Sequence, residues 1–231
     1  MKILALDSSG PSLSVAVSDD NLILSEFFLN TGLTHTQNLA PAVDYVISSS
    51  VRDPKNLDLL AVSIGPGSFT GIKIGLAFIK GMALALGLPC VGVSSCEALA
   101  WQAQKKCLVH DSVICSVISS RELEIYCAFF EFNLDKINRI SDDSYILMCD
   151  FYEKIKKIKK KVVIIGNLSD LCYKYAQDWK INVSRAFIRA SDISNVFYLN
   201  NKPDSGENLC ANYLKLSKAE YQLLNGDFKK T

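Results

Sequence analysis

The order in which extended and helical patterns follow one another along the 231 residues constrains the fold more than any other feature. Three extended runs, separated by short polar turns, predict a meander of strands at Lys2–Leu6, Ser12–Ser18 and Leu22–Leu29. Helices are then predicted at His35–Ser50, Ile72–Leu86 and Ser94–Gln104, and strands at Leu59–Ile64 and Cys90–Val93. The order βββαβαβα is typical of an α/β protein.

A comparable order begins again after Lys105. Strands are predicted at Ser112–Ile118, Leu123–Phe132, Tyr145–Met148 and Val162–Ile165, and helices at Phe151–Lys157, Leu168–Gln177 and Ser191–Leu199. Two copies of βββαβα, the second reduced, indicate the superfold of actin, sugar kinases and chaperone ATPases. We therefore expect an N-terminal lobe over residues 1–105 and a C-terminal lobe over residues 106–231. The last amphipathic stretch, Leu209–Leu224, either packs back or extends as a tail.

Composition and charge narrow the functional classes. The formal net charge is +1, whereas a dedicated nucleic-acid binder would carry a basic excess. The eight cysteines form no C-x-x-C pair and have no His at ligand spacing, so buried thiols are expected rather than zinc. The opening MKILALDSSG is too short for a signal-peptide core, and the apolar stretch Ile72–Leu88 contains two lysines. We expect a soluble cytoplasmic protein without a membrane span.

One carboxylate is a candidate for nucleotide chemistry. Asp7 ends the first strand, where ATPases of this superfold place an Asp that positions metal and phosphates. A phosphotransferase needs a second such group, but the corresponding place in the second lobe holds Ser119-Ser120-Arg121, and the expected glycine-rich adenosine loop is reduced to Gly166. One carboxylate cannot both hold a metal and activate a nucleophile. Asp7 is thus either a phosphate-site residue or a turn acid.

The segment Ser63–Gly81, SIGPGSFTGIKIGLAFIKG, is the most informative stretch. Two glycines bracket a proline and suit a tight strand-to-helix turn, after which a hydroxyl side chain can cap the helix. The segment is not a P-loop, since no G-K-[ST] follows, but free N–H groups at a helix start can hold an anion. The candidates for weak nucleotide or anion binding are therefore Asp7, Gly65, Gly67 and Ser68.

Two further glycines lie inside the predicted helix. Gly71 and Gly75 share one face, which Phe78 and Met82 continue. A glycine in a helix costs roughly 1 kcal/mol relative to alanine, so a compensating close contact is expected. Docking of a partner helix and packing on the chain's own sheet both provide one, and we favour the partner.

Four stretches carry a resemblance to a known family. They are ILALDSSGPSLSVAV near the start, HTQNLAP at His35–Pro41, IGPGSFTGIKIGLAFIKG at Ile64–Gly81 and VGVSSCEALA at Val91–Ala100. Over residues 1–104 the sequence closely resembles TsaB (YeaZ-type) proteins. Beyond them, SSRELEIYCAFF is similar to the family's D-A-R-x-x-E-V-Y segment at Arg121, Glu124 and Tyr126, with Ser119 replacing the Asp. Ala211–Lys215 (ANYLK) faintly resembles its late P-x-Y-L-R stretch.

The resemblance implies a function. TsaB proteins are paralogues of the catalytic subunit TsaD and resemble it in fold. The chain would be a non-catalytic scaffold for threonylcarbamoyladenosine (t6A) synthesis in tRNA, with TsaD and the ATPase TsaE as partners, tRNA bound through the complex, and a homodimer in isolation. The implied interface residues are His35, Leu39, Val43, Gly71, Gly75, Phe78 and Met82. The basic run Lys154–Lys161 is a solvated helix face or, alternatively, a contact to tRNA phosphates.

Three other functions stay open. A small-molecule kinase or ATPase would need a complete two-Asp site. A glycoprotease-like metallopeptidase would need a pair of ligands, but the chain has only His35 and His110, far apart in sequence. A purely structural homodimer would use the same glycine-bearing helix. We expect neither a catalytic residue nor a bound metal.

Overall fold

The computed structural model describes residues 1–32, 35–105, 111–120, 123–133, 136–167, 181–200 and 208–215. The first half forms a five-stranded sheet in the order β3-β2-β1-β4-β5. Its strands are β1 (Lys2–Asp7), β2 (Leu13–Asp19), β3 (Leu22–Leu29), β4 (Leu59–Gly65) and β5 (Cys90–Ser94). β1, β2 and β3 pair antiparallel and β4 and β5 join in parallel, which confirms the predicted meander.

The second half forms a similar sheet in the order β11-β10-β6-β7-β8, with β9 paired to β7. Its strands are β6 (Ser112–Ser119), β7 (Glu124–Asn133), β8 (Lys136–Arg139), β9 (Ser144–Leu147), β10 (Lys161–Gly166) and β11 (Ile181–Arg185). The sequence did not predict β8 or β11. Both are short and carry few apolar residues, so their pairing comes from neighbouring strands rather than from a local pattern.

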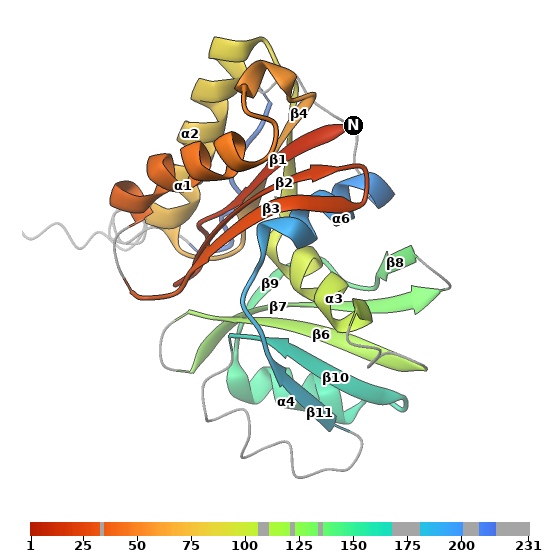
Figure 1. The fold of residues 1–231 in the computed structure, drawn as a ribbon. Helices are drawn as coiled ribbons and strands as arrows, with labels where there is room; N and C mark the ends of the chain where they lie inside the picture. The colour runs from red at the N-terminus through yellow and green to blue at the C-terminus, as the bar shows by residue number, and fades with distance from the viewer. Residues whose placement is uncertain are drawn as a thin grey trace, which may run out of the picture.

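Helices and sheets alternate in layers (Figure 1). The helices are α1 (His35–Ser49), α2 (Phe69–Leu86), α3 (Ser95–Lys105), α4 (Met148–Lys156) and α6 (Ala190–Asn200), with a short 3-10 turn at Pro54–Asn56. α1 and α2 cover the outer face of the first sheet, α3 and α6 lie between the sheets, and α4 covers the second sheet. The layered α/β architecture predicted for the superfold is confirmed.

Neighbouring residues of β1 show why this sheet needs helices on both faces. Ile3 and Ala5 belong to the central core with α3 and α6, whereas Leu4 and Leu6 belong to the outer core with α1 and α2. A strand buried on both faces is largely apolar, as β1 is from Ile3 to Leu6. α6 comes from the second half of the chain but packs against β1 and β2 of the first sheet.

Several predicted bounds differ in detail. α2 begins at Phe69, three residues before the predicted start, because Ser68 caps it: its side chain accepts a hydrogen bond from Gly71 N. In the basic run Lys154–Lys161, Ile155 is buried while α4 leads into β10, which confirms the prediction of a solvated helix face. The predicted helix Leu168–Gln177 lies outside the described residues, as does the part of Leu209–Leu224 beyond Lys215.

Candidate functional site

Asp7 lies at the end of β1 and is fully buried. Its Oδ1 accepts hydrogen bonds from the Ser9 amide at 3.2 Å and the Ser9 hydroxyl at 2.7 Å. No described residue makes a hydrogen bond of ordinary geometry to its Oδ2. Burial raises the pKa of Asp7 to about 6, although the hydroxyls of Ser9 and Ser63 and the charge of His35 pull that pKa down.

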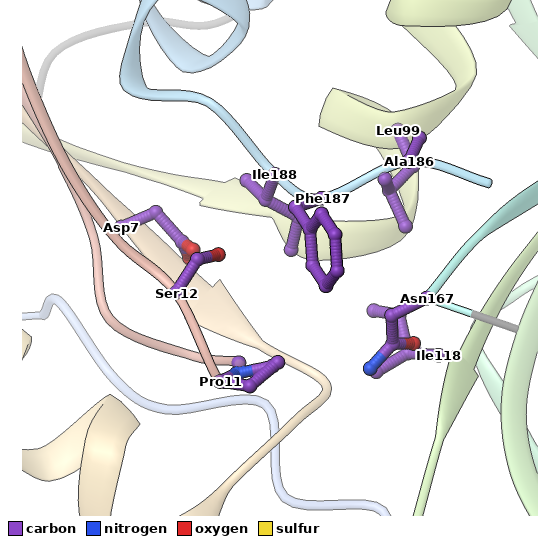
Figure 2. A pocket seen from close by; sticks show the side chains of 10 residues that line it. Asp7, Pro11, Ser12, Leu99, Ile118, Asn167, Ala186, Phe187 and Ile188 are labelled. Carbon is purple, nitrogen blue, oxygen red and sulfur yellow. The ribbon is translucent and has the colours of Figure 1, made fainter. Parts of the chain in front are cut away.

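A small pocket of about 10 Å³ borders Asp7, with room for about one water molecule. Figure 2 shows Pro11 and Ser12 on one side of it and Asn167 on the other, with the Phe187 ring standing between them. His35 stabilises the turn after β1, because its Nε2 lies 2.9 Å from the carbonyl oxygen of Gly10. His35 therefore binds within its own chain, at the turn after β1.

The glycine-bearing loop before α2 packs directly on the turn after β1. The Ser68 amide donates to the Ser9 carbonyl at 2.7 Å. A Cβ added to Gly67 would collide with the same carbonyl oxygen, and one added to Gly71 with the carbonyl oxygen of Ser8. The Ser8 hydroxyl in turn donates to the Gly71 carbonyl at 2.8 Å. These glycines are required because two backbone segments touch there.

The same contacts place groups of the chain itself in the predicted anion site. At the start of α2, where phosphate-binding folds present free N–H groups, the amide of Ser68 meets a backbone carbonyl. Asp7 is sealed behind Ser9, and Gly65, with φ of 100°, faces Ile72 and the Asn212 carbonyl. A metal-bound nucleotide therefore cannot reach the buried Asp7 carboxylate in this arrangement, and the Ser68 and Gly71 amides are already engaged within the chain.

A solvent-open cleft of about 1180 Å³ lies beside this loop, between the ends of the two sheets. One wall comes from the first half of the chain, residues 9–11 and 67–70. The rest comes from the second half: residues 118–120, Glu124, Tyr126, Tyr145, Asn167 and residues 212–215. Ser119, which stands where a phosphotransferase needs an Asp, binds Asn167 instead. Its amide donates to Asn167 Oδ1 and its hydroxyl to the Asn167 carbonyl, both at 2.8 Å.

Residues 208–215, which we call the strap, contact both halves of the chain across this cleft. Leu209 is buried in the outer core of the first sheet, and the Asn212 amide donates to the Ile64 carbonyl of β4 at 2.8 Å. On the other lobe, Asn212 Nδ2 donates to Asp143 Oδ2 at 2.8 Å, and Lys215 pairs with Glu124 at 2.7 Å. Of the two alternatives for Leu209–Leu224, the described part up to Lys215 packs back on the chain. The sequence did not indicate its partners, because they are more than sixty residues away.

The predicted interface residues separate into two groups, which corrects the sequence interpretation. Leu39, Val43, Gly71 and Gly75 are buried within the chain. A Cβ on Gly75 would meet Ser8, Leu6 and Val62, so this glycine packs on the chain's own sheet and cannot contact a partner. Phe78 and Met82 are half-buried against the outer core.

The outward face of α2 is open and, apart from Lys73, apolar. Lys73, Ala77, Gly81 and Leu84 are exposed, and Leu84 is 89% exposed. Nothing lies within 4 Å of a Cβ added to Gly81. The exposed Tyr45 lies on the neighbouring α1. By length and composition α2 is the one helix of the described chain that could cross a membrane, but its inner face packs on the sheet as a core helix does.

The described residues contain no group of three or more His, Cys, Asp or Glu that could hold a metal ion. Cys90, Cys96, Cys115 and Cys127 are buried as free thiols, as predicted, whereas Cys149 and Cys210 are exposed, which the sequence did not predict. Burial raises the pKa of Cys96 and Cys115, which keeps them protonated and unreactive.

Comparisons with known proteins agree on one family. A sequence profile of the TsaD family, described as tRNA N6-adenosine threonylcarbamoyltransferase, matches residues 30–219. The tRNA threonylcarbamoyladenosine biosynthesis protein TsaB of Bacillus subtilis is 25% identical over 95% of this chain and 96% of its own length. TsaB of Buchnera aphidicola subsp. Schizaphis graminum is 31% identical over 71% of this chain and 78% of its own.

The fold is also similar to solved structures. The crystal structure of YeaZ from Pseudomonas aeruginosa superposes with a TM-score of 0.76 at 19% identity, covering 92% of this chain and 99% of that one. A second Pseudomonas aeruginosa structure, of an uncharacterized protein with similarity to peptidase YeaZ, gives a TM-score of 0.79 and covers 93% of this chain. At this identity the similarity establishes the fold alone.

Proposed function

The chain belongs to the TsaB family, and from this we propose that it is the non-catalytic scaffold subunit of t6A synthesis in tRNA. It acts in the bacterial cytoplasm by binding and activating TsaD, together with the ATPase TsaE, while tRNA is held by the complex. In isolation it forms a homodimer. The observation that carries the proposal is the exposed apolar face of α2.

This face has the chemistry of a helix-docking surface. Ala77 and Gly81 are small and exposed, so the backbone of a second helix can approach closely, and Leu84 supplies apolar area that is 89% exposed. An apolar helix face left in water is costly, which favours pairing with a partner or with a second copy. α1 contacts α2, and two helices from each partner would form a four-helix contact.

The closed loop beside Asp7 supports a subunit without catalytic activity of its own. A kinase or ATPase must present phosphates to helix N–H groups and a metal to carboxylates. Here Ser8 and Ser9 carbonyls pack against that loop, and the Ser119 hydroxyl is engaged with Asn167. A metallopeptidase is equally unsupported, because His35 binds the Gly10 carbonyl and no described residue cluster offers metal ligands.

The test is a binding measurement with purified TsaD. Ala77→Arg should weaken binding of this chain to TsaD by at least about tenfold, because a long charged side chain blocks close helix approach. Ile140→Arg is the matched control, since Ile140 is also apolar and 53% exposed but lies beyond β8 in the other lobe. Gly75→Leu is unsuitable, because it would disrupt the core.

Two results would refute the proposal. One is equal TsaD affinity for wild type and Ala77→Arg with both chains folded. The other is t6A formation by TsaD and TsaE, supplied with threonylcarbamoyl-adenylate and tRNA, that is unaffected by adding this chain. ATP hydrolysis by the purified chain that disappears in Asp7→Ala would instead favour the kinase or ATPase reading.

A further inference from the structure

Four side chains form a cluster between β3 and the segment that joins β11 to α6. Arg189 lies over the Phe28 ring at 4.6 Å, Phe28 contacts Phe187 with ring centroids 6.4 Å apart, and Arg185 lies over the Phe187 ring at 5.8 Å. We call Arg185, Phe187, Phe28 and Arg189 the ladder. Arg185 and Arg189 are exposed and the two rings are half-buried.

The ladder is not needed to hold its segment in place. Residues 185–189 are extended between β11 and α6, and the alternate residues Ala186 and Ile188 are buried in the central core. The backbone is fixed on both sides of Phe187: the Ala186 amide donates to the Gly166 carbonyl at 2.8 Å, and Gln102 Nε2 donates to the Phe187 carbonyl at 2.6 Å. The exposed side chains of Arg185 and Arg189 are thus available for recognition.

The charges on the ladder are only partly neutralised. Glu26 pairs with Arg189 at 3.1 Å, and its other carboxylate oxygen accepts hydrogen bonds from the Ser191 amide and hydroxyl at the start of α6. The Glu26 carboxylate therefore pairs with Arg189 and also accepts the hydrogen bonds at the start of α6. No described carboxylate forms an ion pair with Arg185, so the ladder keeps a net positive charge.

We propose that the ladder is a direct contact for unpaired nucleotides of tRNA. An exposed guanidinium beside an aromatic ring can offer its planar face to an RNA base and its N–H edge to a phosphate. An acidic peptide would use the charge alone and gain nothing from flat stacking faces, and a duplex hides its base faces. That the RNA is tRNA rests on the proposed function. The contacts within the ladder do not depend on it.

The contact is predicted to be modest, because the chain has a formal net charge of only +1. Each phosphate that an arginine neutralises adds about 0.7 to 0.9 to the slope of log affinity against log salt. A base stacked on a planar side chain contributes a further share that does not depend on salt. The phosphate contribution and the stacking contribution can be separated by substitutions that keep either the positive charge or the planar group of the side chain.

The experiment measures anisotropy of a fluorescein-labelled tRNA transcript titrated with the full chain, at about 50 mM and about 200 mM salt. Arg185→Gln should weaken binding about five- to tenfold and lower the salt slope by about 0.7 to 0.9. Compared with Arg185→Gln, Arg185→Lys should restore the salt slope but not the affinity. The lysine ammonium carries the charge but has no planar group on which a base can stack. Lys55→Gln, an exposed lysine on the 3-10 turn, is the control and should match wild type.

Three results would overturn the proposal: no saturable binding by wild type at low salt, equal affinity for wild type and Arg185→Gln, or equal affinity for the transcript and a blunt RNA duplex. If Arg185→Gln lowers affinity for TsaD while tRNA binding is unchanged, the ladder is a protein contact and the RNA proposal fails. TsaD binding measured on the same proteins distinguishes this failure from failure of the proposed function.

Discussion

Asp7→Asn should stabilise the protein at neutral pH. The pKa of Asp7 rises from 3.8 to about 6 on folding, because the carboxyl loses its water and Oδ2 gains no hydrogen bond from the described residues. A difference of about 2 pH units, at about 1.4 kcal/mol each, makes ionised Asp7 a cost of about 3 kcal/mol in the folded state. Asparagine occupies the same space without charge, and its carbonyl oxygen can still accept from Ser9.

The sign of the pH dependence follows from the same values. With a folded pKa above the unfolded one, the folded state binds the proton more tightly between pH 3.8 and about pH 6. The contribution of Asp7 to stability therefore falls as pH rises through this window and is flat above it. The gain from Asp7→Asn should be about 1–3 kcal/mol near pH 7.5, since asparagine does not recover the whole cost. Near pH 4, where the wild-type carboxyl is protonated in the folded state, the difference should be lower by about 2.4 kcal/mol, so the substitution becomes close to neutral or destabilising.

Urea unfolding at both pH values measures this difference, provided that the slope of stability against urea is unchanged. Asp142→Asn, at an exposed carboxylate, is the control and should leave stability within about 0.5 kcal/mol. A loss of stability in Asp7→Asn at neutral pH would refute the reasoning. It would mean that the native carboxylate is ionised and compensated by donors or by a bound cation. In that case the phosphate-site interpretation of Asp7 would regain support.

Two further predictions concern the backbone contact and the strap. Gly67→Ala should lower the free energy of unfolding by about 1–3 kcal/mol, because the added Cβ meets the rigid Ser9 carbonyl, whereas Gly81→Ala, with open space around it, should raise it by about 0.5–1 kcal/mol. Equal effects of the two substitutions in chemical denaturation would contradict this account. Asn212→Asp should lower the melting temperature near pH 7 and not near pH 4, because it places a second carboxylate at the 2.8 Å contact with Asp143. A shift of the same size at both pH values, seen by scanning calorimetry, would show that charge repulsion is not the cause.

The local sequence was sufficient for the main elements. Alternation in Ser12–Ser18 and the turn residues around it predict β2, and the apolar spacing in His35–Ser50 predicts α1 within one residue. These patterns follow from the periods of strand and helix, which depend only on neighbours along the chain. The glycines at 65, 67, 71 and 75 also indicated, from sequence alone, that something must approach the backbone closely.

What approaches them was decided by the tertiary structure. Helical periodicity places Gly71, Gly75, Phe78 and Met82 on one side of α2 but does not state which side faces the sheet. The answer comes from Ser8, sixty-three residues before Gly71, whose turn fills the space beside both glycines. The strap and the ladder are likewise contacts between distant segments. Such pairings depend on how strands and helices pack, so a pattern along the sequence contains no record of them.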